Sequence, residues 1–495
     1  MSTLTLDRWL ADQGLATEQP LPPVPVTGVA LDTRELRAGD VFLALRGGSD
    51  HGLRHAQAAI DKGAVAIVAE TPLPEPMTTT FSVPVAAVAS LRGRVGALAA
   101  AVYGTTSAEL RIAGVTGTNG KTSTVQFIAQ AAQALGHRPA TMGTLGAGPL
   151  GRLRPQARTT PDVCSTHRFL AECRDLGCDW LAMEVSSHAL DQGRVDGVHF
   201  EVAVYTQLSR DHLDYHGSMQ AYFDAKAKLF QWHGLRAAVI NLDCPWGLKL
   251  LPQLAADVAV HTYSAAGAES ALITAEDLSL DHQGMHFSLR LGGQQYPVRV
   301  GLMGRFNVDN VLAASGALLA AGVEPALIAA ALAQLQPVPG RMNRLGGDEQ
   351  PLVVVDYAHT PDAIAKALSA LREHQPRRLG IVFGCGGERD RGKRPQMAAA
   401  AEAGADRVYV TDDNPRGEDG DRILDDIRAG FARPQAVLEQ RNRRLAIESA
   451  IADAGAGDIV LIAGKGHETY QEIGGQVLAF DDRAVAAELL RRRAA

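Results

Sequence analysis

The stretch IAGVTGTNGKTSTVQFIAQ, residues 112–130, is the part of the sequence that decides the fold. A short apolar run enters a loop with Gly117 and Gly120, and Lys121 and Thr122 then open a segment of helical periodicity. Glycines let backbone N–H groups turn inward around a phosphate, and the N-terminus of the following helix adds a favourable dipole. The lysine would neutralise the β- and γ-phosphates of a nucleotide, and the threonine hydroxyl would bind Mg²⁺. The stretch therefore predicts a phosphate-binding loop in an α/β domain.

The spacing of this loop departs from the common GxxxxGK pattern, because Val115 stands where the first glycine of that pattern would be. A glycine-rich turn without a ligand is the alternative interpretation. The order of strand, loop, GKT and helix favours a nucleotide site, although a regulatory switch, a kinase and a ligase all use such a loop. The residues expected to bind the nucleotide are Gly117, Thr118, Asn119, Gly120, Lys121, Thr122 and Ser123.

Short runs of β-branched residues alternate with helical periods on both sides of this loop, which is typical of parallel α/β sheets. Residues 1–105 form the first block, and residues 106–337 contain the phosphate loop. Within the second block, alternating residues at 258–302 predict an antiparallel edge. Residues 338–495 predict a second doubly wound, Rossmann-like sheet with ligand-binding loops at the carboxyl ends of its strands. We therefore predict three α/β domains, the central one a P-loop ATPase domain with a mostly parallel sheet.

Composition and charge exclude several classes of protein. The chain has 495 residues, 46% hydrophobic and 21% charged, which fits a soluble globular protein of about three domains. A net charge of −7 argues against a nucleic-acid partner. Asp7 and Arg8 interrupt the N-terminus where a signal peptide would be apolar, and Glu324 and Pro325 divide the most apolar region into two packed helices. The interrupted N-terminus and the divided apolar region predict no membrane insertion. The five cysteines show no CxxC spacing, so we expect reduced thiols and a cytoplasmic location.

Glu184, His212 and Lys226 stand out downstream of the phosphate loop. Glu184 ends the apolar run WLAMEV, and a carboxylate there would bind Mg²⁺ if its strand lies beside the loop; capping of a turn is the alternative. His212 lies in the polar run DHLDYH, where a lone histidine is commonly structural. Lys226 lies on an amphipathic segment whose Tyr222 and Phe223 face a core, and its position alone predicts a surface lysine.

The chain resembles the Mur ligases, the ATP-dependent amide-bond-forming enzymes of bacterial peptidoglycan synthesis. The motifs GVTGTNGKT, MEVSSH, SRDHLDYHG, FDAKAKLF, GRFNVDN, GRM, VVDYAHTPD and GKGHE occur in the order found in that family. The resemblance covers residues 26–483. Within the family it is strongest to the member that adds meso-diaminopimelate to UDP-N-acetylmuramoyl-L-alanyl-D-glutamate.

For the nucleotide and metal, the resemblance implies that Asn310 contacts adenine and that Arg341 and Asp356 complete the ATP site. Lys226 matches a lysine that the family carries as an N-carboxylated (carbamylated) residue. A carbamate offers the hard oxygen ligands that Mg²⁺ prefers, whereas an ammonium would be repelled. The implied catalytic residues are Lys121, Glu184, His212 and Lys226, and the implied Mg²⁺ ligands are Thr122, Glu184, His212 and carbamylated Lys226.

The resemblance also implies an N-terminal domain, residues 1–105, that binds the UDP end of UDP-N-acetylmuramoyl-dipeptide. Residues 106–337 would bind ATP, and residues 338–495 would bind the amino acid. The positions that match contacts of the UDP substrate are Leu31, Thr33, Gly48, Ser49, Asp50, Arg158, Thr159, Thr160, Ser186, Gln192 and Arg194. Arg158 stands where the family often has asparagine.

The stretch TDDNPRGED, residues 411–419, matches the amino-acid pocket of the family. Diaminopimelate differs from lysine by an extra carboxylate on the far carbon, which a guanidinium binds with two hydrogen bonds while acids and amides hold the ammonium. DNPR is the form associated with diaminopimelate-adding members, and lysine-adding members depart from it at the arginine. The implied diaminopimelate-binding residues are Arg389, Asp413, Asn414, Pro415, Arg416, Gly464 and Glu468.

The implied reaction joins the D-glutamate γ-carboxylate to an amine through an acyl phosphate, and ADP is released. We expect a monomer that uses ATP and Mg²⁺. Three alternatives remain: a lysine-adding Mur ligase, a folylpolyglutamate synthetase-like ligase and, from another class, a nucleotide-binding regulator. Turnover of ATP that depends on an acceptor amine separates any ligase from the regulator.

Overall fold

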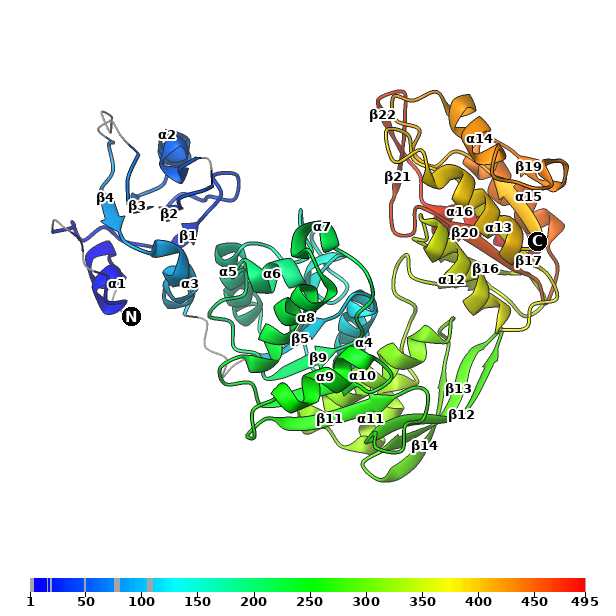
Figure 1. The fold of residues 1–495 in the computed structure, drawn as a ribbon, viewed down its shortest axis with the longest axis horizontal. Helices are drawn as coiled ribbons and strands as arrows, with labels where there is room; N and C mark the ends of the chain where they lie inside the picture. Colours follow the sequence, from blue (N-terminus) through cyan, green and yellow to red (C-terminus); the bar gives the residue numbers. More distant parts are fainter. Residues whose placement is uncertain are drawn as a thin grey trace. The chain divides into compact units, whose positions relative to one another are not determined.

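The computed structural model describes residues 4–15, 17, 20–48, 50–74, 81–104 and 110–494 (Figure 1). Ser49, expected to contact the UDP substrate, lies outside the described residues. The chain forms two compact units, residues 1–263 with 313–324 and residues 264–312 with 325–495.

A four-stranded parallel sheet, in the order β1-β2-β3-β4, occupies the N-terminal part of the first unit. Leu43 and Phe42, adjacent on β2, point into two separate cores, as expected for a parallel sheet with both faces covered. The first core also includes Val163 and Cys164, which belong to a helix of the next domain. The elements are α1 (Leu6–Asp12), β1 (Gly28–Ala30), β2 (Asp40–Ala44), η1 (Gly52–His55), α2 (Ala56–Asp61), β3 (Ala66–Glu70), β4 (Val85–Val88), η2 (Leu91–Arg94) and α3 (Val95–Tyr103).

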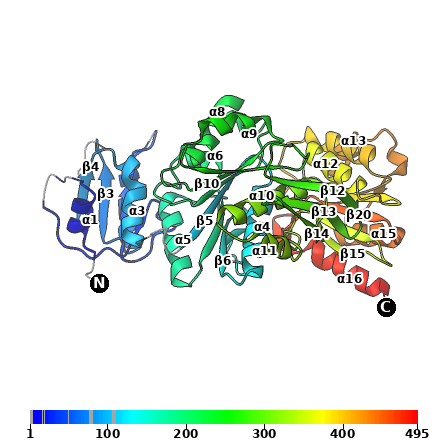
Figure 2. The same cartoon turned by 90° about the horizontal axis from the view of Figure 1, so that it is seen from below.

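The larger sheet of the first unit has the order β11-β10-β9-β5-β8-β6-β7, and only the β6–β7 pair is antiparallel. Figure 2 shows helix α4, which follows the phosphate loop, beside β6. Val115 of β5 pairs with Glu184 of β8, so the condition on which a metal role for Glu184 depended is met. The elements are β5 (Arg111–Thr116), α4 (Lys121–Ala134), β6 (Pro139–Gly143), β7 (Gly146–Pro149), α5 (Val163–Asp175), β8 (Trp180–Glu184), α6 (Ser187–Asp191), β9 (Val202–Tyr205), α7 (Leu213–His216), α8 (Met219–Ala227), η3 (Lys228–Gln231), β10 (Ala237–Asn241), α9 (Pro245–Leu250), η4 (Leu251–Gln253) and β11 (Ala259–Ser264).

An antiparallel meander follows in the sequence, as the alternating pattern predicts. Strands β12 (Ile273–Asp281), β13 (Gly284–Leu291) and β14 (Gln294–Val300) pair in succession. Helices α10 (Phe306–Ala320) and α11 (Pro325–Leu332) follow, and the chain is divided between them near Glu324, as predicted. No helix in the described part of the chain is long and apolar enough to cross a membrane.

The C-terminal sheet has the order β15-β16-β20-β17-β18-β19, and all neighbours are parallel except β15 with β16. The pattern of strands each followed by a helix predicts a helix directly after β20, and this was wrong: β20 leads into a hairpin, β21–β22, before the last helix. Gly474 and Gly475 both have positive φ (57° and 76°), which a two-residue hairpin turn requires. The elements are β15 (Asn343–Gly346), β16 (Leu352–Asp356), α12 (Pro361–Arg372), β17 (Leu379–Phe383), α13 (Lys393–Gly404), β18 (Arg407–Val410), α14 (Gly420–Arg428), η5 (Pro434–Ala436), β19 (Leu438–Glu439), α15 (Arg443–Asp453), β20 (Ile459–Ala463), β21 (Tyr470–Ile473), β22 (Gln476–Ala479) and α16 (Asp482–Ala494).

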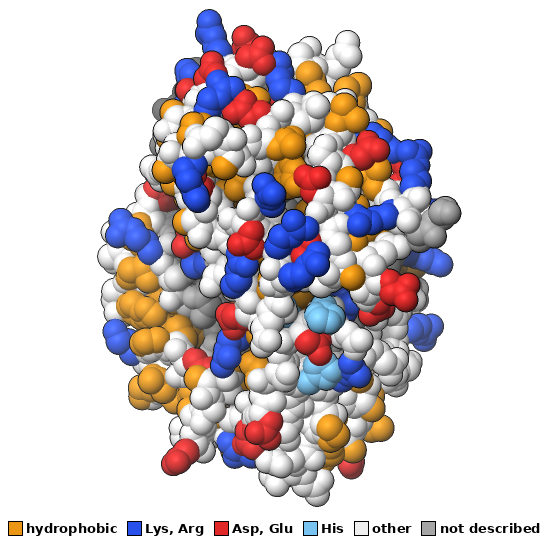
Figure 3. All heavy atoms as spheres, turned by 90° about the vertical axis from the view of Figure 1, so that its right-hand side faces the viewer, with side chains coloured by type: hydrophobic (Ala, Val, Ile, Leu, Met, Phe, Trp, Pro, Cys, Tyr) orange, Lys and Arg blue, Asp and Glu red, His pale blue; other side chains and the backbone are white. Residues whose placement is uncertain are grey.

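The fold is thus α/β, with three main sheets that are mostly parallel. On the face shown in Figure 3, basic and acidic side chains are interspersed and form no continuous basic patch. The cysteines are buried free thiols.

Candidate active site

The phosphate loop joins the end of β5 to the start of α4 in a conformation that requires glycine. Gly117 and Gly120 have φ of 150° and 87°, and a Cβ on Gly117 would collide with the hydroxyl of Thr206. That hydroxyl donates to the carbonyl of Asn119 at 2.6 Å, and the Thr118 amide donates to a carbonyl beyond β9 at 2.7 Å. The neighbouring strand therefore holds the loop open around the space where a phosphate would lie.

Two of the expected nucleotide and metal residues are directly linked. The Thr122 hydroxyl donates to Oε1 of Glu184 at 2.9 Å, and the Thr144 amide donates to the same oxygen at 2.8 Å. Lys121 Nζ donates to the carbonyls of Gly117 and Thr118 at 2.9 and 2.8 Å, so its ammonium lies over the loop. The site therefore places a hydroxyl and a carboxylate, both ligands that Mg²⁺ accepts, at the first turn of α4.

Lys226 is not the surface residue that its sequence position alone predicted. Its side chain is 1% exposed, and Nζ donates to the carbonyl of Gly117 at 2.8 Å. Nζ also lies 4.6 Å from the ring centre of Tyr222. Burial, and after it the charge of Lys121, lowers the pKa of Lys226 well below its usual value. A buried lysine with a lowered pKa supplies the neutral amine that carbamylation requires.

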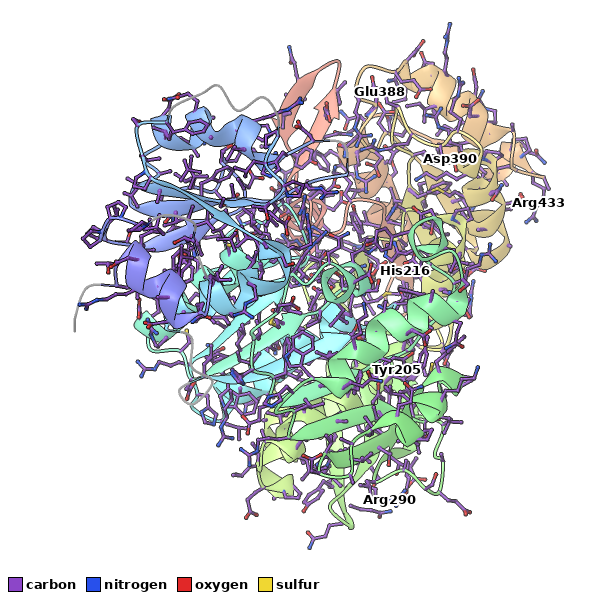
Figure 4. All side chains as sticks on the ribbon, turned by 60° about the vertical axis from the view of Figure 1, so that its left-hand side comes forward. Tyr205, His216, Arg290, Glu388, Asp390 and Arg433 are labelled. Carbon is purple, nitrogen blue, oxygen red and sulfur yellow. The ribbon has the colours of Figure 1, made fainter. Side chains whose placement is uncertain are left out.

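His212 lies at the start of α7 with a left-handed backbone, φ 51°. Its ring is half-exposed, 3.5 Å from the carboxylate of Asp211 and edge-on to His188 at 4.9 Å. His216, labelled in Figure 4, bonds to Ser187 at 3.0 Å, so this segment packs on α6 just beyond Glu184. Among the described residues no three His, Cys, Asp or Glu side chains form a ready metal cage. The Thr122 hydroxyl and the Glu184 carboxylate fit Mg²⁺, which takes few protein ligands and completes its shell with phosphates and water.

Most residues matched to the muramoyl-dipeptide contacts lie beside Glu184. Thr160 Oγ1 donates to the Glu184 carbonyl at 2.8 Å and accepts from the Ser186 amide at 3.2 Å. Arg194 donates to the Thr160 carbonyl at 3.1 Å and to Gln192 Oε1 at 3.0 Å. Thr159 contacts Thr144, which itself donates to Glu184. The structure therefore brings these side chains together at the metal end of the nucleotide site.

A cavity of about 410 Å³ lies between the N-terminal sheet and α5, lined by Asp32, Arg34 and Arg158 among others. Asp32 is flanked in sequence by the expected contacts Leu31 and Thr33, and hydrogen bonds from Arg34 lower its pKa to about 2. Gly48 and Asp50 do not line this cavity; Asp50 pairs instead with Arg54 at 2.7 Å.

Arg168 of α5 closes the inner wall of the cavity. Its buried guanidinium pairs with Asp40 at 2.6 Å and donates to the carbonyls of Val29 and Glu35 at 3.1 and 2.8 Å. The hydroxyl of Tyr103 accepts a further hydrogen bond from Arg168 Nε at 2.9 Å. The side chain therefore fixes the β1–β2 loop, which carries the expected uridine contacts, against the central domain.

The other residues matched to ATP lie in the second unit. Asn310 donates to Asn307 Oδ1 at 2.9 Å on α10. The Asp356 carboxylate, at the end of β16, accepts from the amides of Met342 and Ala358, both at 2.9 Å, and burial raises its pKa. Arg341 lies with its guanidinium carbon 5.7 Å from the ring centre of Tyr357.

The acceptor residues expected from TDDNPRGED gather at the carboxyl ends of β17, β18 and β20. Asn414 donates through Nδ2 to Glu468 at 2.9 Å. Its Oδ1 accepts from Lys465 Nζ and from the Glu472 amide, both at 3.0 Å. Asp413 is buried, which raises its pKa, and a Cβ on Gly464 would collide with its carboxylate.

Arg416 adopts a left-handed backbone, φ 55°, and its amide donates to the Glu472 carbonyl at 2.9 Å. Nη1 donates to the Gly387 carbonyl at 2.8 Å, and Nε lies 3.4 Å from the Glu472 carboxylate. Its side chain is 20% exposed, while Arg389 is an exposed residue. Glu472 also donates its amide to Asn414, so Arg416 and Asn414 are held on the same residue of the hairpin.

Comparison with known proteins gives the family. The model for the Mur ligase family, catalytic domain, matches residues 25–103; that for the Mur ligase middle domain matches residues 115–318; that for the Mur ligase, glutamate ligase domain matches residues 340–466. The chain belongs to the Mur ligase family.

Full-length relatives agree with this assignment. The UDP-N-acetylmuramoyl-L-alanyl-D-glutamate--2,6-diaminopimelate ligase of Xanthomonas campestris pv. campestris (strain 8004) is 55% identical over 495 residues, covering 99% of this chain and 98% of that protein. The protein of the same name from Xylella fastidiosa (strain 9a5c) is 54% identical over 481 residues, covering 95% and 96%. A solved structure of a ligase of that name is 37% identical, covers 100% of both chains and has a TM-score of 0.76.

Sequence reasoning missed two residues of this Mur ligase that touch the acceptor set. Lys465 is fully buried and binds both Asn414 and Glu468, each at 3.0 Å. Its signal was present, since it is the lysine of GKGHE, but no role was assigned to it. Glu472 had no signal, because the hairpin that carries it was not predicted.

Proposed function

We propose that this Mur ligase adds meso-diaminopimelate to the D-glutamate of UDP-N-acetylmuramoyl-L-alanyl-D-glutamate in the cytoplasm, converting ATP to ADP and phosphate during peptidoglycan synthesis. The observation that carries the proposal is the full-length similarity to ligases of that name. The cluster of Arg416, Asn414 and Glu468, a cation near amide and acidic groups, supports it because the far end of diaminopimelate carries both a carboxylate and an ammonium.

In the first step, the D-glutamate γ-carboxylate attacks the γ-phosphorus of ATP, and the bond to the β–γ bridging oxygen breaks. Lys121 and the loop amides near Gly117 stabilise the charge that spreads over the transferring phosphoryl group. Mg²⁺, when held by Thr122, Glu184, His212 and carbamylated Lys226, supplies further charge neutralisation. Thr160, Ser186 and Arg194 would orient the dipeptide end of the substrate beside Glu184.

In the second step, the neutral amine of diaminopimelate attacks the acyl carbon of the acyl phosphate. A C–N bond forms, the C–O bond to phosphate breaks, and the amine proton leaves with the released phosphate or solvent. Asn414 and Glu468 would hold the amino acid in place, which makes the encounter effectively unimolecular.

The carbamate of Lys226 is part of this proposal. The neutral Nζ attacks CO₂, an N–C bond forms, one proton is released, and the product carries oxygen ligands suited to Mg²⁺. The burial of Lys226 and its lowered pKa support this step. We also propose that residues 1–105 bind the UDP end, residues 106–337 bind ATP, residues 338–495 bind the amino acid, and the chain acts as a monomer.

One experiment tests the proposal against its rivals. Phosphate release is measured with UDP-N-acetylmuramoyl-L-alanyl-D-glutamate and a panel of free amino acids. We expect turnover with meso-diaminopimelate and little with L-lysine. Preference for L-lysine would indicate a lysine-adding ligase, use of a folate acceptor would indicate a folylpolyglutamate synthetase-like enzyme, and turnover without any acceptor amine would favour a regulator. Formation of AMP and pyrophosphate would contradict the acyl-phosphate route.

A further inference from the structure

Two loops of the second unit carry the arginines of the proposed acceptor pocket. Residues 384–392 follow β17 and include Arg389, and residues 411–419 follow β18 and include Arg416. The two strands are parallel neighbours, so both loops leave the same edge of the sheet. Glu388, labelled in Figure 4, marks the first loop.

The loops touch through glycine backbone. The Gly387 amide donates to the carbonyl of Asn414 at 2.9 Å, and the Gly387 carbonyl accepts from Arg416 at 2.8 Å. A Cβ on Gly387 would collide with the carbonyl of Pro415, so only glycine permits this approach. Glycine has the least restricted backbone of all residues, and a loop built on it needs anchors from outside to hold one conformation.

Arg394, in the first turn of α13, provides such an anchor for both loops. Its side chain is 0% exposed, and its Nη1 and Nη2 bond to the two oxygens of Glu418 at 2.8 and 2.7 Å. Nη1 also bonds to Asp426 at 2.8 Å, and Nη2 donates to the Gly386 carbonyl at 3.3 Å. Glu418 in turn accepts the Glu388 amide at 3.0 Å. One buried guanidinium therefore holds the arginine-bearing segments of both loops.

The charges of this pair are maintained at neutral pH. Hydrogen bonds from Arg394, and after them the Glu388 amide, lower the pKa of Glu418 to about 2. A planar guanidinium matches the two oxygens of a carboxylate, whereas the single ammonium of lysine cannot reproduce both bonds.

We propose that Arg394 is a positioning residue for the acceptor amino acid: through Glu418 and the Gly386 carbonyl it fixes the spacing between Arg389 and Arg416 without touching the substrate. The inference rests on the proposed function, because it assigns the acceptor pocket to these two loops. Diaminopimelate has a carboxylate at each end, so its binding needs two cations at a fixed separation. An amino acid with a single carboxylate, such as lysine, does not need that separation.

The test uses the full-length protein and the variants Glu418→Gln and Arg394→Lys. Both keep much of the original shape and remove the two-pronged ion pair. We expect the KM for meso-diaminopimelate to rise by about tenfold or more, which corresponds to about 1.4 kcal/mol. The KM values for ATP and for the UDP-dipeptide, and kcat at saturating diaminopimelate, should change by less than about twofold. Arg428→Lys, which alters the exposed Arg428–Glu439 pair of the same domain, is the matched control and should leave all constants near those of the wild type.

The outcomes are distinct. Unchanged KM for diaminopimelate in folded Glu418→Gln overturns the inference, as does an equal loss for ATP, UDP-dipeptide and amino acid, which would indicate general structural damage. If Arg394→Lys does not fold, as judged by its near-ultraviolet circular dichroism, Glu418→Gln alone decides. The wild type is assayed with diaminopimelate first. If it does not use diaminopimelate at all, the proposed function is contradicted before any variant is compared.

Discussion

Replacement of Arg416 by alanine is the most direct test of the acceptor pocket. A buried ion pair that loses one partner costs about 3–5 kcal/mol, and an exposed pair contributes about 0–1 kcal/mol. The Arg416 side chain is 20% exposed and already has Gly387 and Glu472 as neighbours, so an intermediate cost applies. We expect a loss of about 2–3 kcal/mol, or roughly 30- to 150-fold in kcat/KM for meso-diaminopimelate.

The assay compares kcat/KM for meso-diaminopimelate and for L-lysine in the wild type and in Arg416→Ala. Lysine lacks the far carboxylate, so its residual use should fall much less. Binding of ADP, measured by calorimetry, should stay near that of the wild type, and Arg428→Ala serves as the control for loss of an arginine elsewhere in the domain. Equal losses for the two amino acids would refute the reasoning, because Arg416 would then organise its loop without binding the carboxylate.

Three further predictions concern other parts of the molecule. Gly117→Ala should abolish detectable ADP binding in calorimetry while the protein remains folded, because the new Cβ meets Thr206; normal binding would show that the loop can rearrange. Lys226→Ala should lose nearly all activity and regain part of it with added short carboxylic acids, and ¹³C-bicarbonate should give a carbamate resonance in the wild type alone; full activity of the variant would contradict the proposed modification. The Arg394–Glu418 pair should stabilise the fold fully above about pH 4.5, the ordinary pKa of a glutamate, and lose its contribution as the pH falls towards about 2. Denaturation of wild type and Glu418→Gln across that window measures this, and a difference independent of pH would be incompatible with it.

Much of the fold follows from local pattern. The runs around Val115 and Glu184 were apolar enough to predict parallel strands, and this prediction was confirmed. The glycines after Val115 predicted a phosphate-binding loop, and the structure shows the expected order of strand, loop and helix. The hairpin after β20 was missed, although its Gly474-Gly475 pair is a turn signal, because its strands are short and largely exposed and so lack a strong apolar period.

The site was predicted less completely, because burial depends on contacts between distant residues. Lys226 has the sequence context of a surface lysine, and only the approach of the phosphate loop, 109 residues away, buries its amine. Arg394 likewise follows an exposed charged segment, and its burial depends on Glu418 and Asp426 from a later loop and helix. Neither periodicity nor local composition contains that information.

The hydrogen bonds and the ion pair of Arg168 limit which domains of this protein could be exchanged with those of its relatives. A chimera that exchanged the N-terminal sheet at the boundary near residue 105 would leave the guanidinium of α5 facing a foreign surface. Asp40 and Tyr103 would depart with the old domain, and the apolar side chains of Val163 and Cys164 would lose the core that they share with it. A buried cation that loses its partner lowers the stability of the fold, so Arg168, Asp40 and Tyr103 have to be exchanged together. The N-terminal sheet is therefore not freely interchangeable, and any graft has to carry its half of this junction.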